Sequence, residues 1–250
     1  MIVIKIGGSL LTNKAVYRSV KIENLRRFAM QIKSVREPMV VVHGTGSFGK
    51  PQAQMYHYMD GLIAAEQYEV VAKVEGDLDK LRGHVMDCLR DFSLPVISIN
   101  VASLFKANNQ EIDALSLECI ERLLKNGIFP VISGGFVPNI NSGFTVCSSD
   151  YIAALLAVRL KVRMLIYATD REILTGSGAV ERLSESDLRY DDWIQDADND
   201  VSRGLRGKLE AGFMAANSGI DTFVINGNLS NCYLNLLQGT ATGSTKLYPA

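Results

Sequence analysis

A glycine-rich segment, His43–Pro51 (HGTGSFGKP), directly follows the apolar run Met39–Val42. Glycines allow successive backbone N–H groups to turn toward bound oxygens, and a helix that begins after them adds its partial positive charge. Two of the glycines and Lys50 fit most of the P-loop pattern, but Pro51 stands where that motif needs a serine or threonine to bind magnesium. The segment therefore predicts an oxyanion-binding loop that is not a P-loop.

Two lysines at opposite ends of the chain carry the charge that phosphoryl transfer requires. Lys5 lies near the end of a run of isoleucine and valine, where burial of an unpaired ammonium group is costly. Lys208 completes a glycine-flanked GLRGK turn that opens a predicted helix. Such cations stabilise oxygens that gain charge in the transition state. Taken singly, Lys5 could also be an edge-strand residue whose stem reaches water, and Lys208 a solvated residue in a first helical turn.

Other polar residues are less specific. Asp150 precedes the predicted helix Tyr151–Val158, so it is either an N-cap or an acid that positions the two lysines. Thr169 and Asp170 follow a buried strand, and they either bind a nucleotide or cap a turn. Lys14 is by default an exposed loop residue. The histidines have no metal-ligand spacing and predict no metal site: His43, His57 and His84.

The composition is that of a globular protein without a nucleic-acid-binding surface. Of the 250 residues, 47% are hydrophobic and 21% are charged, and the formal net charge is −1. The four cysteines are scattered without a CxxC pair, which argues against a zinc site or a disulfide framework and favours a reducing compartment. The apolar start is interrupted by Lys5 and two glycines, so it predicts neither a signal peptide nor a membrane span. We therefore expect a cytoplasmic protein with no nucleic-acid or membrane partner.

Short β-branched runs alternate with longer helical patterns along the chain. The expected strands are buried and parallel: Ile2–Ile6, Met39–Val42, Val96–Ile99, Phe129–Ile132, Met164–Tyr167 and Thr222–Ile225. The expected amphipathic helices lie between them: 22–35, 71–89, Leu115–Leu124, Tyr151–Val158 and Leu209–Ala216. This alternation predicts an α/β fold with a mostly parallel sheet and helices on both faces. An acidic stretch, Glu181–Asp200, is expected to be a solvated connection.

Four of the predicted strands end in glycine, hydroxyl or charged residues. These ends are Lys5–Ser9, His43–Pro51, Ser133–Gly135 and Ala168–Asp170. In an open α/β sheet the active site lies beyond the carboxyl ends of the strands. The four ends are therefore expected to converge on one crevice.

Taken together, these segments resemble the amino acid kinase superfamily. The resemblance rests on five motifs in the same order: KIGGS at Lys5–Ser9, GTGSFG at Gly44–Gly49, SSDYIAALLA at Ser148–Ala157, ATD at Ala168–Asp170 and GLRGKLEA at Gly204–Ala211. The GSFG loop followed by proline, the LLTNK segment and the stretch Tyr56–Gly61 are similar to the branch that contains isopentenyl phosphate kinases and the fosfomycin-resistance kinase.

The resemblance implies a Mg·ATP-dependent kinase with a three-layer αβα sandwich fold. It also implies a single domain over residues 1–250 and a homodimer. Residues 1–160 would bind the acceptor and residues 161–250 the nucleotide. The catalytic residues would be Lys5, Lys14, Asp150 and Lys208. The nucleotide would contact Lys5, Gly7, Gly8, Ser9, Thr169, Asp170, Gly207 and Lys208. The anionic small-molecule acceptor would contact Gly44, Thr45, Gly46, Ser47, Gly49, Lys50, Gly134 and Gly135.

The resemblance also implies individual roles. Lys5 and Lys208 would neutralise the transferring phosphoryl group, while Asp150 would orient both lysines. Lys14 would assist at the terminal phosphate of the nucleotide. Gly8 and Gly44 would donate backbone amides. The helix around 70–89 would help to shape the acceptor site.

Three departures from the family pattern affect the identity of the acceptor. Lys50 stands where the branch has histidine, Gly134-Gly135 replaces Gly-Asp, and the nucleotide motif TDVDG reads Thr169–Ile173 (TDREI). Lysine keeps a positive charge but loses the titration of imidazole near neutral pH. The leading hypothesis is transfer of the γ-phosphoryl group to a phosphate- or phosphonate-bearing acceptor. The alternatives are a carboxylate kinase that forms an acyl phosphate and a non-catalytic nucleotide or oxyanion binder.

Overall fold

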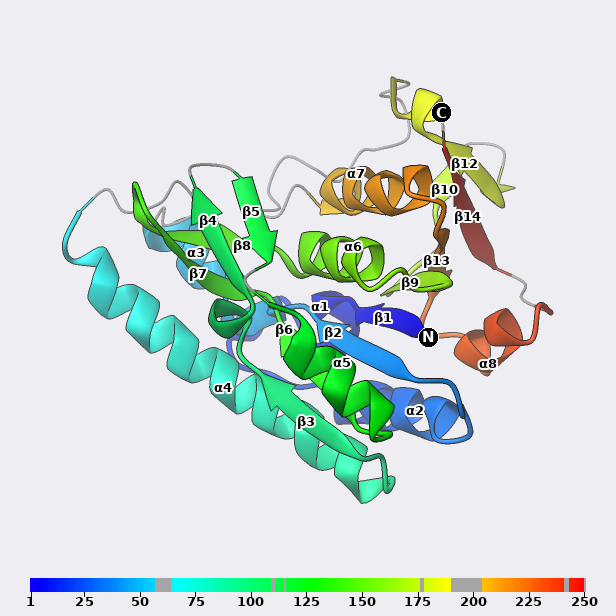
Figure 1. Ribbon diagram of the computed structural model, residues 1–250, viewed down its shortest axis with the longest axis horizontal. Helices are drawn as coiled ribbons and strands as arrows, with labels where there is room; N and C mark the ends of the chain where they lie inside the picture. The colour runs from blue at the N-terminus through cyan, green and yellow to red at the C-terminus, as the bar shows by residue number, and fades with distance from the viewer. Residues whose placement is uncertain are drawn as a thin grey trace.

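The computed structural model describes residues 1–56, 64–108, 111–114, 116–175, 178–189, 204–240 and 243–249. Its main element is an eight-stranded sheet (Figure 1). In spatial order the strands are β12 (Arg182–Ser184), β14 (Ser244–Tyr248), β13 (Asp221–Asn226), β9 (Met164–Thr169), β1 (Ile2–Ile6), β2 (Met39–His43), β6 (Phe129–Ser133) and β3 (Val96–Ile99). Six of these are the strands predicted from the sequence, and they run parallel to one another, while β14 pairs with β13 in the antiparallel sense. The predicted mostly parallel sheet is confirmed.

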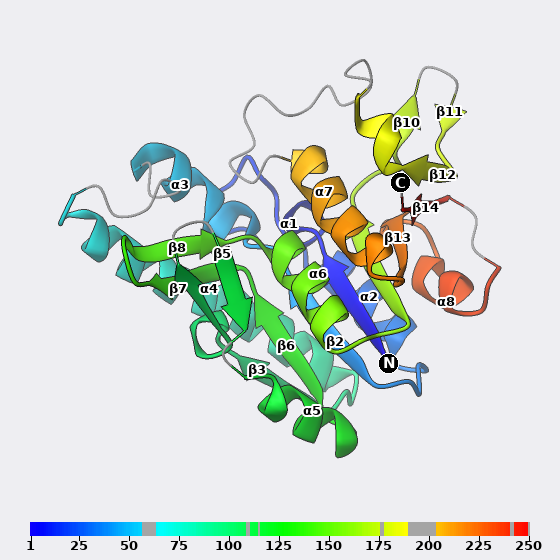
Figure 2. The ribbon, with the colours of Figure 1, turned by 45° about the horizontal axis from the view of Figure 1, so that its top comes forward.

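Helices cover both faces of the sheet, as the alternating pattern predicts (Figure 2). β1 lies in the interior of the sheet between β2 and β9, and all its residues are buried. Because successive side chains of a strand point to opposite faces, Ile4 and Ile6 pack toward one helical layer, and Val3 and Lys5 point toward the other. The first layer contains α2 (Ile22–Ile32), α4 (Gln67–Asp91) and α8 (Cys232–Leu237). The second contains α5 (Glu118–Lys125), α6 (Ser149–Arg159) and α7 (Gly204–Asn217).

Several predicted helix ends differ from those of the structure. α5 begins at Glu118 rather than at residue 115, which lies outside the described residues. α2 ends at Ile32, and Val35, the last apolar residue of its periodic pattern, packs on the core from the turn that follows. α4 begins at Gln67 rather than at residue 71, and α7 begins at Gly204 rather than at residue 209. The described residues also form two short helices and three 3₁₀ turns: α1 (Gly8–Leu11), α3 (Lys50–Tyr56), η1 (Gly46–Phe48), η3 (Val101–Ser103) and η4 (Glu185–Arg189).

A second, four-stranded sheet was not predicted. Its order is β5 (Glu111–Ala114), β4 (Phe105–Asn108), β7 (Gly135–Asn139) and β8 (Gly143–Cys147), and a two-stranded ribbon forms from β10 (Leu174–Thr175) and β11 (Gly178–Ala179). The strands of the four-stranded sheet have only four or five residues each, so the alternation of apolar and polar residues is too short to stand out. The β7–β8 hairpin connects β6 to α6, so it carries the chain from one side of the pocket to Asp150.

The loops after β1 and β2 touch backbone to backbone, and glycines make this approach possible. A Cβ atom on Gly8 would lie 2.7 Å from the backbone nitrogen of Gly46, and one on Gly44 would lie 2.7 Å from the nitrogen of Gly8. Gly46 also has a positive φ of 50°, and a side chain there would collide with Thr12. The glycines that follow β1 and β2 therefore allow these two loops to come into contact.

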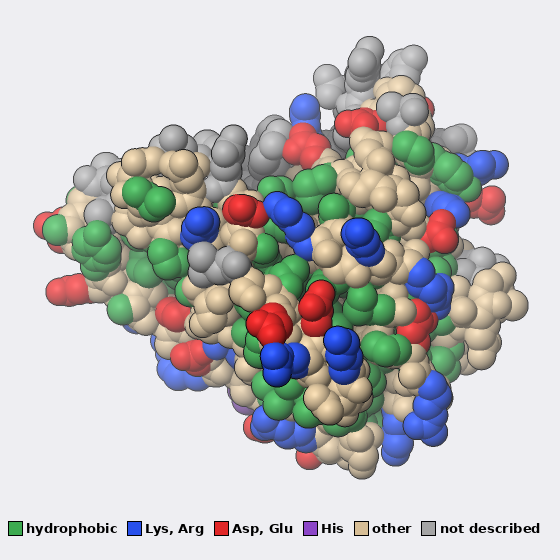
Figure 3. Space-filling model, viewed as in Figure 1, with side chains coloured by type: hydrophobic (Ala, Val, Ile, Leu, Met, Phe, Trp, Pro, Cys, Tyr) green, Lys and Arg blue, Asp and Glu red, His purple; other side chains and the backbone are tan. Residues whose placement is uncertain are grey.

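The acidic stretch 181–200 is not simply a solvated connection. Its first part forms the edge strand β12, which pairs with β14, and then the turn η4. Residues 190–200 lie outside the described residues, as do residues 57–61 of the Tyr56–Gly61 stretch. On the face shown in Figure 3, basic and acidic side chains of the described residues are interspersed. None of the described helices has the length and the apolar character that crossing a membrane requires.

The contact between the two loops predicts opposite effects for two glycine-to-alanine substitutions. Gly8→Ala should lower the free energy of unfolding by about 1–3 kcal/mol, because the atoms it meets are rigid backbone. Gly76→Ala, in the middle of α4 with no neighbouring atom within 4 Å, should raise it by about 1 kcal/mol because alanine favours the helix. Urea unfolding curves of both variants measure this, and a Gly8→Ala protein as stable as wild type would contradict the contact.

Candidate active site

A single cavity of about 510 Å³ lies beyond the carboxyl ends of four neighbouring strands. The residues that follow β1, β2, β6 and β9 all line it: Gly7, Gly44, Gly134 and Asp170. The sheet order places these strands side by side, as β9, β1, β2 and β6. The predicted convergence of four strand ends on one crevice is therefore confirmed.

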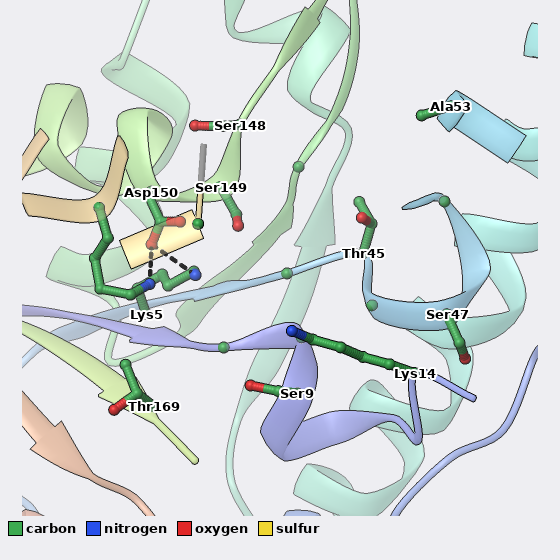
Figure 4. A pocket seen from close by; sticks show the side chains of 18 of the residues that line it. Lys5, Ser9, Lys14, Thr45, Ser47, Ala53, Ser148, Ser149, Asp150 and Thr169 are labelled. Atoms are coloured by element: carbon green, nitrogen blue, oxygen red, sulfur yellow. Dashed lines mark hydrogen bonds and ion pairs between the residues drawn. The ribbon is translucent and has the colours of Figure 1, made fainter. Parts of the chain in front are cut away.

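One carboxylate oxygen at the centre of the cavity holds both lysines (Figure 4). The Oδ1 atom of Asp150 lies 2.6 Å from Nζ of Lys5 and 2.8 Å from Nζ of Lys208. The three residues come from β1, α6 and α7, and they are only 3%, 6% and 8% exposed. Two ammonium groups on one carboxylate leave a net positive charge when both are protonated, which is what a bound phosphate requires.

The structure excludes the alternative structural explanations that the sequence left open for Lys5, Lys208 and Asp150. Lys5 does not lie on an edge strand, because β1 has a neighbour on each side. Lys208 is not a solvated first-turn residue, because α7 already begins at Gly204 and the lysine is buried. Asp150 is not the N-cap of α6: Ser148 takes that position and its Oγ accepts a hydrogen bond from the Tyr151 amide at 3.1 Å.

Burial and charge act in opposite directions on the ionisation of the cluster. Burial would raise the pKa of Asp150, but the charges of Lys208 and Lys5 and their hydrogen bonds outweigh burial and hold it well below its usual range. Burial lowers the pKa of Lys5 to about 7; the Asp150 charge opposes this shift and the Lys208 charge adds to it. The carboxylate is therefore always charged near neutral pH, whereas the charge of Lys5 depends on what lies beside it.

Tyr167 supports the cluster and was missed by the sequence analysis. It is fully buried on β9, and its hydroxyl donates a hydrogen bond to the backbone oxygen of Asp150 at 2.9 Å. The ammonium group of Lys208 also lies 5.5 Å from the centre of its ring. A tyrosine in an otherwise aliphatic buried strand was the available signal, because its hydroxyl needs a partner.

The loop after β2 lines the cavity with five predicted acceptor residues: Gly44, Thr45, Gly46, Ser47 and Gly49. Thr12, which the sequence analysis missed, ties this loop to α1, since its Oγ1 accepts from the Ser47 amide at 2.9 Å and donates to the Gly8 oxygen at 2.8 Å. The Gly44 amide donates to the Ile6 oxygen at 2.9 Å, so the sheet uses the amide that the resemblance assigns to a ligand. Lys50 begins α3, and its side chain lies outside the described part of the structure.

The opposite end of the cavity holds the predicted nucleotide residues. Gly7, Gly8, Ser9, Thr169 and Asp170 line it, together with residues 171–173, Gly204 and Leu205. Gly207 is not among the described lining residues. Lys14 is exposed, lines the cavity, and in Figure 4 its ammonium group points toward the side where Lys5 lies.

Beyond the glycine loop the cavity has an apolar wall. Gly134 and Gly135 line it at the start of β7, and the remaining lining residues here are Pro51, Ala53, Val74, Leu78, Phe136 and Val146. Phe136 packs edge-on against Phe144, with ring centres 5.5 Å apart. On α4, within the helix expected to shape the acceptor site, Val74 and Leu78 reach the cavity, while Leu81 is a fully buried core residue. Phe136 and Val146 were missed because the second sheet was missed.

His43 and the cysteines do not form a metal site. Among the described residues, no three acidic, histidine or cysteine side chains group around a common point. His43 is fully buried, and burial lowers its pKa to about 4, so it is neutral near pH 7. The four cysteines are free, and Cys119 alone among them is exposed. His57 lies outside the described residues.

Known proteins resemble this chain in sequence and in fold. The isopentenyl phosphate kinase of Methanocaldococcus jannaschii is 28% identical over 256 residues, which cover 97% of this chain and 96% of the relative. The isopentenyl phosphate kinase of Methanothermobacter thermautotrophicus is 26% identical and covers 99% of this chain and 98% of its own length. A crystal structure of isopentenyl phosphate kinase has a TM-score of 0.86 at 24% identity, covers 99% of each chain, and supports the fold.

The family itself is identified by a sequence model of the amino acid kinase family, which matches residues 1–226. That span includes every strand that borders the cavity and both buried lysines. The chain therefore belongs to the amino acid kinase family and is an ATP-dependent phosphotransferase.

Proposed function

We propose that this protein transfers the γ-phosphoryl group of Mg·ATP to the phosphate group of a small acceptor that carries an apolar tail, such as isopentenyl phosphate. The observation that carries the proposal is the division of one continuous cavity into a cationic centre and an apolar end. The relatives named for isopentenyl phosphate support the same choice.

The apolar end favours an alkyl phosphate over an amino acid. Val74, Leu78, Phe136 and Val146 offer contacts to methylene groups, which are worth about 0.8 kcal/mol each when buried. No arginine, asparagine or glutamine side chain is among the described residues that line this end. An amino-acid acceptor would leave its ammonium group without a partner there, and that is costly in an apolar site.

The chemistry would be in-line transfer by positioning and charge stabilisation. Lys5 and Lys208 would bind the oxygens of the transferring group, which gain charge as the reaction proceeds, and Asp150 would keep both ammonium groups in place. Lys14 would act at the terminal phosphate from the exposed side. The acceptor phosphate is already anionic, so it needs no strong general base. The electrostatic repulsion between this phosphate and ATP would instead be offset by these cations and by Lys50.

The two ends of the cavity would be used by the two substrates. Residues 1–160 would bind the acceptor and residues 161–250 the nucleotide, with the loop after β1 between them. Magnesium prefers oxygen ligands. The carboxylates of Asp170 and Glu172 at the nucleotide end would be suitable ligands, together with phosphate and water oxygens. We also expect a homodimer in the cytoplasm.

A panel of acceptors tests the proposed reaction. With Mg·ATP and an ADP-release assay, isopentenyl phosphate should give the highest kcat/KM, ahead of a small phosphonate, inorganic phosphate and glutamate. Higher kcat/KM with glutamate would replace the proposal by a carboxylate kinase. ATP binding without ADP release on any acceptor would leave only the nucleotide-binding alternative.

A pair of leucines on α4 tests where the tail binds. Leu78→Ala should raise KM for isopentenyl phosphate about 10-fold to 100-fold while leaving KM for inorganic phosphate near its wild-type value, because it removes apolar contact area from the cavity wall. Leu81→Ala is the matched control, since this leucine is equally buried but does not line the cavity. Equal effects of the two substitutions on the ratio of the two KM values would mean that the tail binds elsewhere.

The charge balance among Lys5, Asp150 and Lys208 predicts how kcat/KM for ATP depends on pH. In the free protein the pKa of Lys5 is lowered to about 7, and the ammonium form is the one that binds phosphate, so kcat/KM for ATP should fall as pH rises above about 7. Asp150→Asn removes the charge that holds the Lys5 pKa up, so the fall should begin at lower pH. Initial rates between about pH 6 and 9 measure it. Asp113→Asn, an exposed carboxylate paired with Arg159, is the control, and identical profiles for both variants would contradict the role of Asp150.

A further inference from the structure

Hydrogen bonds between its first and last residues close the loop that carries Lys14. We call residues 13–19 the Lys14 loop; it connects α1 to α2. The Asn13 amide donates to Oγ of Ser19 at 2.9 Å, and that hydroxyl donates back to the Asn13 oxygen at 3.0 Å. Lys14 and the residues up to Arg18 are exposed. Within the loop the Ala15 amide also donates to Oδ1 of Asn13 at 3.1 Å. These contacts hold the loop together, while the position of its tip, Tyr17 and Arg18, against the rest of the molecule is set by other contacts.

The tip of the Lys14 loop is held by one buried carboxylate on α4. The Tyr17 hydroxyl donates to Oδ2 of Asp77 at 2.6 Å, and the Arg18 guanidinium pairs with Oδ1. The same guanidinium lies 4.8 Å from the centre of the Tyr17 ring. Lys80 also reaches Oδ1, at 3.2 Å. Both carboxylate oxygens of Asp77 are therefore used, and two of their three partners come from the loop.

The burial of Asp77 indicates that this contact contributes to the structure and is not a casual surface contact. Asp77 is only 1% exposed, although its loop partner Tyr17 is 41% exposed. Burial alone would raise the pKa of Asp77, but the hydrogen bonds from Tyr17, Arg18 and Lys80 outweigh it and the pKa is lowered. A carboxylate buried in this way is strongly destabilising when its partners leave, so the loop is held in one position.

The location of Asp77 connects the loop to the acceptor end. It lies on the turn of α4 that also carries Val74 and Leu78, the two α4 residues that line the apolar wall. The same helical turn thus contacts the proposed tail site and fixes the loop from which Lys14 reaches the cavity. Because a misplacement of about 1 Å at a reacting group can cost 100-fold in rate, the anchor of this loop matters for turnover.

We propose that Asp77 is a positioning residue that holds Lys14 over the cavity through Tyr17 and Arg18. The proposal rests on the proposed function for the role of Lys14 at the terminal phosphate. Asp77 is not among the described residues that line the cavity, and its partners Tyr17 and Arg18 belong to the Lys14 loop. Loss of the anchor lowers kcat while KM for the acceptor, which is set by the apolar wall, changes little.

A double-mutant cycle measures whether Asp77 acts through Lys14. Asp77→Asn should lower kcat about 10-fold or more in the wild-type background and have almost no effect in the Lys14→Ala background, because coupled residues are not additive. Asp87→Asn is the matched control: it is an exposed aspartate in an i,i+3 pair on the same helix, about 15 Å from Asp77. An equal loss of kcat from Asp77→Asn in both backgrounds, or no loss from Lys14→Ala alone, overturns the proposal.

Trypsin cleavage tests the anchor without any assay of activity, so it also separates failure of this proposal from failure of the proposed function. Trypsin cuts after lysine and arginine, and the loop offers Lys14 and Arg18. Cleavage at these two positions should be about 10-fold faster in Asp77→Asn than in wild type and unchanged in Asp87→Asn, since the rate follows the population of the released loop. Equal cleavage of Asp77→Asn and wild type overturns the proposal, whatever the acceptor.

The loop side of the contact provides a second variant that leaves Asp77 itself unchanged. Tyr17→Phe combined with Arg18→Gln removes both loop partners while Asp77 keeps Lys80, and both substituted residues are at the surface. This variant should show the same fall in kcat and the same faster cleavage after Lys14 as Asp77→Asn. Wild-type kcat in this variant overturns the proposal.

Discussion

The shared carboxylate of Asp150 is the interaction on which the site depends. Two ammonium groups would not stay buried within a few ångströms of each other without it, because both desolvation and mutual repulsion favour their neutral forms. The carboxylate lies on the first turn of α6, and each lysine comes from a different element. The fold must therefore bring β1, α6 and α7 together before the site exists. The charge that remains is positive, and a bound phosphate completes the balance.

Close backbone contact determines how the two ends of the cavity lie relative to that centre. The loops after β1 and β2 meet through Gly8 and Gly44, and Thr12 ties α1 to the second loop. A side chain at either glycine would separate the loops and move the proposed acceptor away from the lysines. The glycines of an anion loop thus serve two purposes, since they expose some amides and allow the close approach that aligns the two ends of the cavity.

The sequence allowed the fold class and the cationic centre to be predicted because both leave strong local signals. Buried parallel strands are continuous β-branched runs, and Lys5 interrupts one of them. The pairing of Lys5 with Lys208 could not be derived from spacing, because 203 residues separate them, and it came from the resemblance. The second sheet left no comparable signal, and with it Phe136 and Val146 were missed. Tyr17 and Asp77 also escaped notice, since each is an ordinary residue until the loop and α4 are placed together.

The division of the cavity separates the chemistry from the choice of substrate. In the proposed reaction the lysine cluster would bind oxygens of any phosphate, so it would not distinguish isopentenyl phosphate from inorganic phosphate. That distinction would fall to the wall formed by α4, β7 and β8, and the β7–β8 hairpin of the four-stranded sheet connects β6 to α6. Burial of about five carbon atoms is worth roughly 3–4 kcal/mol, or a few hundred-fold in binding. This preference would be large enough to select a tailed acceptor, and it would come from residues other than Lys5, Asp150 and Lys208. Substitutions in the wall can therefore change the acceptor without disturbing the balance of charge at Asp150.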